Sequence, residues 1–479
     1  MNGSARRDES DSGGVTVFER ELLLEAPPET VYAWHARPGA FGRLSPPWER
    51  VELVRHTGEV EDGARVRLRL SVAGMPVYWD LEHTDHQAGR QFCDRQVRGP
   101  FRSWHHLHRF EPVGPDRTLL RDRLTIGLPF GALGRLLGGG FLRRQLERLF
   151  QYRHEVTASD LRLMVQRDKE QKPPMNILVT GASGLIGETL VPFLTTQGHR
   201  VVTLGRNPDP GDSNAFQWDP DKGELDDRAF EGVEAVIHLA GANLAAGRWS
   251  SARKKAILES RVKGTRLLVE RIARAGGQVR SLVSSSAIGY YGDTGETPAD
   301  ESSPNGRGFL AEVCRCWEEE AMKIRGSGVR LVLMRTGVVL TPKGGALGAI
   351  LPVFRKGAGG PVGGGRQWMS WISVDDLAAA FLHALETESL SGPCNGVAPE
   401  PVRNADLAEI LGRLLHRPAV VPVPSMALRL LFGQMADETL LASCRVLPGA
   451  LEKAGFTFRH PNLDAALRHV LGLAEGSPS

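Results

Sequence analysis

Three glycines that follow a short apolar run constrain this chain more than any other feature. Residues 176–180 (NILVT) have the apolar, β-rich composition of a buried parallel strand. Gly181, Gly184 and Gly187 come next, followed by a helical pattern (ETLVPFLTTQG) and a second apolar run (HRVVTL). A glycine triplet alone is weak evidence, but its position between a strand and a helix predicts the βαβ unit of a dinucleotide-binding sheet.

Each glycine is expected to have its own physical role. Gly181 permits a tight turn, Gly184 lets backbone amides approach a pyrophosphate, and Gly187 lets the helix pack closely on the strand. Unsatisfied N–H groups and the dipole at a helix start attract phosphate. The predicted phosphate-binding segment is Gly181, Ala182, Ser183, Gly184, Leu185, Ile186 and Gly187.

The residues after the second strand set the expected choice of cofactor. A site that selects NAD usually places an acidic residue there to accept from the ribose 2′-hydroxyl. This chain has Gly205-Arg206-Asn207, with no acidic residue before Asp209. A guanidinium matches a 2′-phosphate in charge and geometry, so we expect NADP(H) rather than NAD(H). An ordinary surface arginine is the alternative interpretation of Arg206.

The length of 479 residues predicts two or three domains. The best boundary is residues 166–174, where a charged run ends in Pro173-Pro174. A net charge of +3 gives no reason to expect nucleic acid as a partner. The polar first residues, the lack of a membrane-length apolar run and five cysteines without metal-like spacing predict a reduced, cytoplasmic protein. The oligomeric state cannot be inferred.

Residues 15–165 alternate as short strands and end in a long helical pattern (FLRRQLERLFQYRHEVTASDLRLMV). This order predicts an α+β unit in which a curved antiparallel sheet wraps one C-terminal helix. It resembles the START-like, polyketide-cyclase-like superfamily, a helix-grip fold. The resemblance implies an apolar ligand between sheet and helix; a packed domain that only supports its neighbour is the alternative.

The same unit contains His105, His106 and His108, which raise the question of a metal site. On a strand, His106 and His108 share one face and His105 lies on the other. No cysteine or carboxylate pattern nearby completes a ligand set, so no metal is expected.

From residue 175 onward, the chain resembles an atypical branch of the extended short-chain dehydrogenase/reductases. The resemblance rests on the glycine motif, VEAVIHLAGANL, VSSSAIGYYG, LVLMRTGVVL and a C-terminal cap over about residues 400–475. It implies a doubly wound Rossmann-type parallel sheet over residues 175–479. Further cofactor contacts are then expected from Leu239, Ala240, Gly241, Ser284, Ser285, Arg335, Thr336, Gly337 and Val338.

The resemblance fails at the catalytic dyad. Extended members follow the serine loop with Tyr-x-x-x-Lys, where the tyrosine is the acid/base. In this chain the same place has Phe309 and Val313, or Leu310 and Cys314 after a shift of one residue. No Tyr-x-x-x-Lys occurs anywhere in the sequence.

Three residues therefore remain as candidate catalytic groups. Ser286 matches the family's serine and is expected to bond the reacting oxygen, while Tyr290 or Tyr291 could carry the proton. Both tyrosines could equally be packing residues of the loop. The sequence thus predicts an NADP(H)-dependent oxidoreductase or epimerase-like protein acting on a small molecule. A catalytically inactive NADP(H)-binding sensor or scaffold is the alternative.

Overall fold

The computed structural model describes residues 15–72 and 74–473. The chain divides into two compact units. One contains the residues up to Pro173 together with Thr195–Gly198, and the other contains the remainder.

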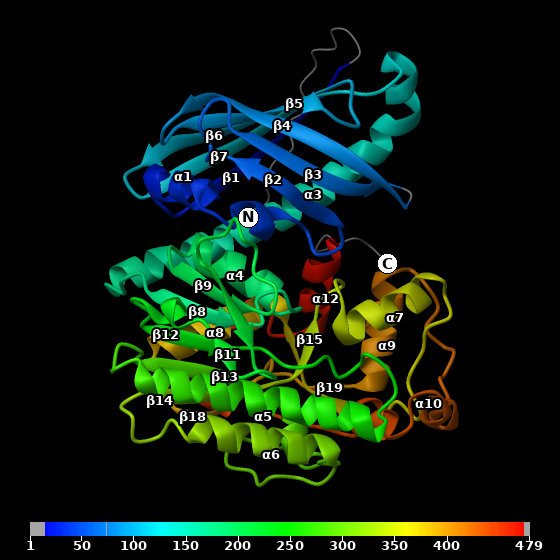
Figure 1. Cartoon of the computed structure of the whole chain (residues 1–479). Helices are drawn as coiled ribbons and strands as arrows, with labels where there is room; N and C mark the ends of the chain where they lie inside the picture. Colours follow the sequence, from blue (N-terminus) through cyan, green and yellow to red (C-terminus); the bar gives the residue numbers. More distant parts are fainter. Residues whose placement is uncertain (1–14, 73, 474–479) are drawn as a thin grey trace. The chain divides into compact units, whose positions relative to one another are not determined.

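The first unit is a seven-stranded antiparallel sheet with one long helix against it (Figure 1). The strand order is β1-β7-β6-β5-β4-β3-β2, so the first strand pairs with the last. Every second residue is buried over residues 104–110 of β6 and 118–126 of β7, as expected when one face of the sheet is covered. The elements are β1 (Val15–Leu24), α1 (Pro28–Ala36), α2 (Ala40–Leu44), β2 (Val51–Thr57), β3 (Arg65–Val72), β4 (Met75–Gln87), β5 (Gln91–Arg98), β6 (Ser103–Gly114), β7 (Arg117–Gly127) and α3 (Gly131–Lys169).

The core of this unit lies between the sheet and α3. Phe150 of α3 is almost fully buried, and its ring lies 5.5 Å from that of Phe18 on β1. A second apolar cluster joins α1 to the sheet through Trp34 and Phe110. The expected helix-grip fold is confirmed.

The second unit is built on an eight-stranded sheet with the order β11-β10-β9-β8-β12-β13-β14-β18. All neighbouring strands are parallel except β10 and β11. The strands are β8 (Asn176–Thr180), β9 (Arg200–Gly205), β10 (Ala215–Asp219), β11 (Glu224–Leu225), β12 (Ala235–His238), β13 (Ser281–Ala287), β14 (Arg330–Thr336) and β18 (Gly392–Gly396). Two small sheets pair β15 (Val338–Leu340) with β17 (Trp371–Ser373) and β16 (Trp368–Met369) with β19 (Val402–Arg403).

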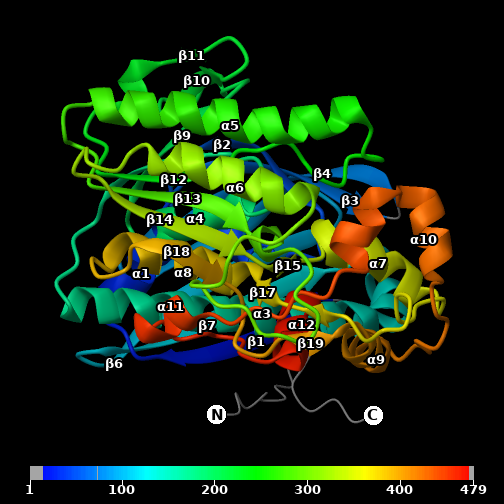
Figure 2. The same ribbon diagram turned by 90° about the horizontal axis from the view of Figure 1, so that it is seen from below.

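Helices cover both faces of this sheet. The helices α5 and α6 lie side by side on one face, and α8 lies on the other (Figures 1 and 2). The helices are α4 (Gly187–Thr196), α5 (Ser251–Arg274), α6 (Phe309–Met322), α7 (Gly345–Arg355), α8 (Val374–Glu386), α9 (Asn404–Leu414), α10 (Ser425–Phe432), α11 (Gly449–Lys453) and α12 (Leu463–Leu471), with short turns η1 (Asp227–Phe230), η2 (Ile288–Tyr291) and η3 (Ala436–Leu440).

The strand order fixes where a ligand can bind. Chain progression reverses between β8 and β12, which pair directly. In open parallel sheets the crevice at the carboxyl ends of such strands is the usual ligand site. The Rossmann-type doubly wound fold is confirmed, and the glycine motif lies at this reversal. Within the described residues, no helix combines the length and apolarity needed to span a bilayer.

Candidate functional site

The turn between β8 and α4 requires glycine at two of its three motif positions. Gly181 has φ of +74°, and a Cβ there would lie 2.9 Å from the backbone nitrogen of Ala240. A Cβ on Gly187 would lie 2.4 Å from the carbonyl oxygens of Gly181 and Ala182. Both positions are therefore dictated by the close approach of the chain to itself.

Gly184 differs because only one group lies close to it. A Cβ there would meet one neighbour, the carbonyl oxygen of Gly181, at 3.1 Å. The same carbonyl accepts the Gly184 amide at 3.0 Å. The next two amides, of Leu185 and Ile186, donate to no group within the described chain. Free amides at the start of a helix form an anion site, and Gly184 keeps the approach to it open.

Arg206 follows β9 directly and is exposed. Its carbonyl oxygen accepts a hydrogen bond from Gln217 at 2.9 Å, which holds the backbone against β10. Among the described residues, no carboxylate pairs with its guanidinium, whereas Arg200 on the same strand bonds Asn214. The Arg206 side chain is thus available to a phosphate.

The residues after β12 are held against the end of β8. The Leu239 amide donates to the Thr180 carbonyl, and the Ala240 amide donates to the Thr180 hydroxyl, each at 3.2 Å. A Cβ on Gly241 would lie 3.1 Å from the guanidinium carbon of Arg261. Arg261 is buried and donates hydrogen bonds to the carbonyl oxygens of Ala242 and Ile257.

A buried histidine connects the two strands at the site, and sequence reasoning did not identify it. Nδ1 of His238 lies 2.7 Å from the Thr180 hydroxyl, and Nε2 lies 3.0 Å from that of Thr265. Burial, with a smaller effect from Arg261, lowers the pKa of His238 to about 3. The imidazole is therefore neutral, and it positions the strand ends.

The serines of β13 have three different surroundings. Ser286 donates a hydrogen bond of 2.7 Å to Oε1 of Glu318. Ser284 makes a weak 3.4 Å bond to the Ser285 carbonyl. The buried Ser285 hydroxyl has no hydrogen-bond partner within the part of the chain described here. A ligand at the carboxyl end of β13 is one explanation of this unmet hydrogen-bonding capacity.

Arg335 belongs to a buried hydrogen-bond network beside Ser286, its partner on the neighbouring strand. Its guanidinium makes two 2.8 Å hydrogen bonds to the Glu318 carboxylate and donates to the Tyr291 hydroxyl at 2.9 Å. Tyr291 in turn donates to Oδ1 of Asn395 at 2.7 Å. The sequence singled out Arg335 but gave no sign of Glu318 or Asn395, which belong to no motif.

The two candidate tyrosines lie in unlike environments. Tyr291 is 4% exposed, and burial raises the pKa of its phenol to about 12. Tyr290 is half-buried, and its ring lies 3.5 Å from the Arg335 guanidinium carbon. A proton carrier must reach the reacting atoms, so the exposed part of Tyr290 makes it the better placed of the two.

The remaining predicted cofactor residues link β14 to the small β15–β17 sheet. The Gly337 amide donates to the Gly396 carbonyl at 3.0 Å, and that of Val338 donates to the Ser370 carbonyl at 2.9 Å. A Cβ on Gly337 would lie 2.8 Å from the Ser370 carbonyl oxygen. The Thr336 hydroxyl makes a weak 3.4 Å bond to the Met334 carbonyl.

Both alternative positions for the missing dyad lie at an apolar contact. Phe309, Leu310 and Val313 pack in one cluster with Trp249 and Met435. Burial raises the pKa of the remaining candidate, the Cys314 thiol, to about 11. The amides of Phe309 and Leu310, at 3.0 and 2.8 Å, donate to Glu438, which caps α6 from the C-terminal segment.

The histidines of the first unit alternate as expected, with His105 exposed and His106 and His108 buried. However, the expectation that no carboxylate accompanies them is wrong. Asp94 on β5 pairs with His106, and Asp122 on β7 pairs with His108. Both carboxylates come from neighbouring strands, so only the strand register, not the local sequence, could have revealed them.

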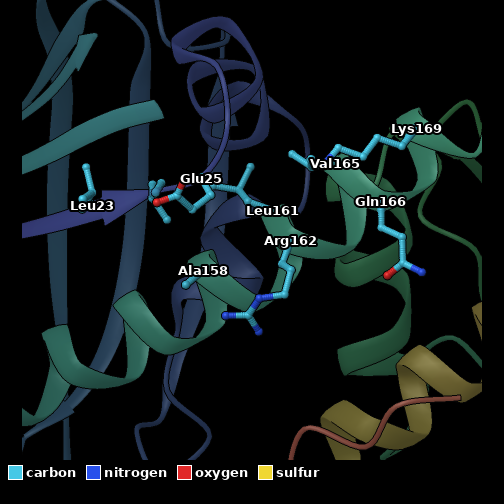
Figure 3. Close-up of a pocket in the computed structure, with 9 residues that line it drawn as sticks. Leu23, Glu25, Ala158, Leu161, Arg162, Val165, Gln166 and Lys169 are labelled. Atoms are coloured by element: carbon cyan, nitrogen blue, oxygen red, sulfur yellow. The ribbon is translucent and has the colours of Figure 1, made fainter. Parts of the chain in front are cut away.

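A pocket of about 330 Å³ lies beside the end of β1 and the C-terminal half of α3 (Figure 3). Its lining mixes apolar and charged side chains: Leu23, Leu24, Glu25, Ala158, Leu161, Arg162, Val165, Gln166 and Lys169. The apolar ligand expected for this unit stays a prediction.

Comparison with known protein families matches three segments of the chain. Residues 177–394 match the NAD dependent epimerase/dehydratase family. Residues 24–150 match the family of polyketide cyclase/dehydrase and lipid transport proteins. Residues 423–470 match a domain of unknown function, DUF1731, within the predicted cap.

Individual relatives align with the second unit. An epimerase family protein of Mycobacterium tuberculosis is 43% identical over 294 residues, which are 61% of this chain and 97% of that protein. Human epimerase family protein SDR39U1 is 36% identical over 300 residues, which are 62% of this chain and 100% of that protein.

Two solved structures are also similar. A crystal structure of a nucleoside-diphosphate sugar epimerase from Corynebacterium glutamicum is 32% identical, with a TM-score of 0.78. The match covers 95% of this chain and 90% of that one. A crystal structure of human SDR39U1 isoform 2 with NADPH is 34% identical with a TM-score of 0.58, covering 62% of this chain and 99% of the human one.

Proposed function

We propose that residues 175–479 bind NADP(H). The chain belongs to the NAD-dependent epimerase/dehydratase family, as an atypical short-chain dehydrogenase/reductase fused to a polyketide-cyclase-like domain. The observation that carries the proposal is the turn at Gly184. Free amides of Leu185 and Ile186 lie there at the start of α4, beside a glycine that the protein's own packing does not demand. The NADPH in the human relative's structure supports the same conclusion.

The preference for NADP(H) over NAD(H) rests on Arg206. Its exposed guanidinium follows β9, where an NAD-selective site places a carboxylate. It can bind a 2′-phosphate through two parallel hydrogen bonds, which a ribose hydroxyl cannot match.

We further propose that the unit transfers hydride as an oxidoreductase or epimerase-like enzyme on a small molecule. The nicotinamide would supply or accept the hydride. Ser286 donates its hydroxyl hydrogen to Glu318, so its oxygen could act toward a substrate hydroxyl only as an acceptor. Tyr290 would carry the proton, and Tyr291 would position Arg335 against it.

A sensor or scaffold without chemistry is the second candidate, and one observation favours it. In one of the two alignments, the positions of the usual Tyr and Lys are held by Phe309 and Val313, which belong to an apolar cluster. Such a protein would bind NADPH and change its conformation or a partner's affinity without turnover.

Turnover separates the two candidates. The full chain with NADPH is presented with a panel of carbonyl compounds and nucleoside-diphosphate sugars, and cofactor oxidation or sugar conversion is measured. Enzymatic function predicts activity with at least one compound, a loss of about 100-fold in kcat for Tyr290→Phe, and a smaller loss for Ser286→Ala. NADPH binding without any turnover across the panel would favour the sensor.

The first unit is proposed to take an apolar ligand. The leucine and valine side chains in the pocket beside α3 support this, and solvent extraction of the purified chain tests it. A bound apolar molecule found by mass spectrometry is the expected result, and an empty extract from a stable sample would count against it.

A further inference from the structure

A group of buried histidines and aspartates lies on the inner face of the first unit's sheet, outside the site described above. It contains Asp94 from β5, His106 and His108 from β6, and Asp122 from β7. His106, His108 and Asp122 are each at most 6% exposed. These four residues form a histidine–aspartate cluster.

Three of the cluster's side chains direct one donor atom each toward a common point. Oδ2 of Asp94 lies 3.5 Å from Nε2 of His108 and 3.9 Å from Nδ1 of His106. A ligand atom of each of the three lies within 4.8 Å of those of the other two. Two ligands bonded to one metal ion at about 2.1 Å lie about 3.0–3.5 Å apart, so a small side-chain movement would bring the three donors into bonding range.

The opposite nitrogens of both histidines face a second carboxylate. Oδ1 of Asp122 lies 3.1 Å from Nε2 of His106 and 2.7 Å from Nδ1 of His108. Metal-binding histidines usually present their other ring nitrogen to a carboxylate, which fixes the orientation of the ring. The second oxygen of Asp94 is likewise held, 3.0 Å from Nε2 of His83.

Hydrogen bonding alone does not account for the arrangement. Nδ1 of His108 is buried and, despite its 2.7 Å distance from Asp122, makes no hydrogen bond of normal geometry within the described residues. Two carboxylates share this space, faced by the imidazoles of His83, His106, His108 and His154 with Arg153 nearby, and their charges are costly to bury unless these groups or a bound ion carry positive charge. A divalent ion would balance both.

We propose that Asp94, His106 and His108 bind a divalent transition-metal ion, with Asp122 orienting the two imidazoles. Two histidines and one carboxylate are a ligand set for Zn²⁺ or Fe²⁺, and they leave coordination positions open to water or a small oxygen ligand. The competing explanation is a metal-free ion-pair network, in which His108 carries a proton between Asp94 and Asp122.

The test uses the full chain without a histidine tag, stripped with a chelator and titrated with Co²⁺. The expected result is one tight equivalent with the visible ligand-field bands of nitrogen and oxygen ligation, displaced by Zn²⁺. Asp94→Asn and His106→Gln should each lower the affinity at least about 100-fold, and Asp122→Asn about 10–100-fold. His105→Gln, on the exposed face of the same strand, is the matched control and should bind as the parent does.

Circular dichroism shows whether each variant is folded. If a variant does not fold, the spectrum of the cobalt-bound parent identifies the ligands. A thiolate-to-cobalt charge-transfer band would assign the ion to cysteine and would overturn the proposal. No tight Co²⁺ binding by the parent, or binding that Asp94→Asn and His106→Gln leave unchanged, would overturn the proposal.

Discussion

Glu318 and Arg335 form a two-point ion pair, with both hydrogen bonds at 2.8 Å, beside the candidate catalytic serine, which is the strand partner of Arg335. The same carboxylate accepts a hydrogen bond from the Ser286 hydroxyl. The same guanidinium donates to the Tyr291 hydroxyl and lies over the Tyr290 ring. The pair is 5% and 3% exposed, so neither charge has water as an alternative partner. The geometry of the candidate catalytic residues therefore depends on two charged groups outside the family's catalytic motif.

Glu318→Gln should be strongly destabilising, because it leaves the Arg335 charge buried without its partner. We expect a loss of about 3–5 kcal/mol in the free energy of unfolding of the second unit, measured by urea denaturation. Glu319→Gln is the matched control, since Glu319 pairs with Arg315 at the surface and should change stability by less than about 1 kcal/mol. Equal effects of the two variants would mean that the buried pair is not needed.

Arg206→Ala should alter cofactor choice without altering the fold. Loss of charge-assisted hydrogen bonds to a 2′-phosphate, at about 1.5–3 kcal/mol, predicts a 10- to 100-fold weaker Kd for NADPH. The Kd for NADH should change by less than about three-fold. Both are measurable by fluorescence titration, with the exposed Arg274, at the end of α5, replaced by alanine as a charge-matched control. A parallel loss for both cofactors would refute the assigned role.

Restoring the family's lysine should fail. Val313 is 2% exposed within the apolar cluster of Trp249 and Met435. Phe309→Tyr with Val313→Lys would bury an unpaired ammonium, and we expect a loss of about 3–5 kcal/mol in unfolding free energy. Phe309→Tyr alone, at a half-buried position, should be tolerated within about 1 kcal/mol. A double variant that is stable and gains activity would show that residues 309 and 313 can hold a working Tyr–Lys dyad.

The buried His238 predicts a specific pH dependence of stability. Its pKa is about 3 in the folded chain and near 6.5 when unfolded, so the unfolded state binds the proton more readily. The stability that the neutral His238 contributes to the folded state is fully present above pH 6.5 and is lost as the pH falls toward 3. Between pH 7.5 and 5.0, the parent should lose about 2 kcal/mol more unfolding free energy than His238→Gln does. Identical pH slopes in urea unfolding would contradict this assignment.

Local sequence patterns predicted the βαβ unit because its requirements are local. Gly181 and Gly187 are demanded by contacts with residues close in the chain or at the end of a neighbouring strand, and the motif encodes those demands. The alternation of β6 likewise predicted that His106 and His108 share one face and that His105 lies on the other. These features follow from periodicity and backbone geometry alone.

Groups brought together by strand pairing could not be predicted in the same way. Asp94 and Asp122 meet His106 and His108 through the registers of β5 and β7 with β6. Glu318 reaches Arg335 from a helix, and Asn395 reaches Tyr291 from a strand, and no motif links either of them to its partner. Polar networks of this kind depend on how strands and helices pair in the folded chain, which a single sequence does not reveal.

If the amides beside Gly184 hold a dinucleotide's phosphates, as we propose, the substitution Gly184→Ala should obstruct them. In the free protein the added methyl group would meet only the Gly181 carbonyl oxygen, at 3.1 Å, a tight contact that a shift of a few tenths of an ångström relieves. Isothermal titration of the full chain with NADPH should therefore show binding by the parent and by the helix control Gly138→Ala. Gly184→Ala should keep its fold and bind at least about 100-fold more weakly, or about 2.7 kcal/mol. Undiminished NADPH binding by folded Gly184→Ala, or no binding by the parent, would contradict the account.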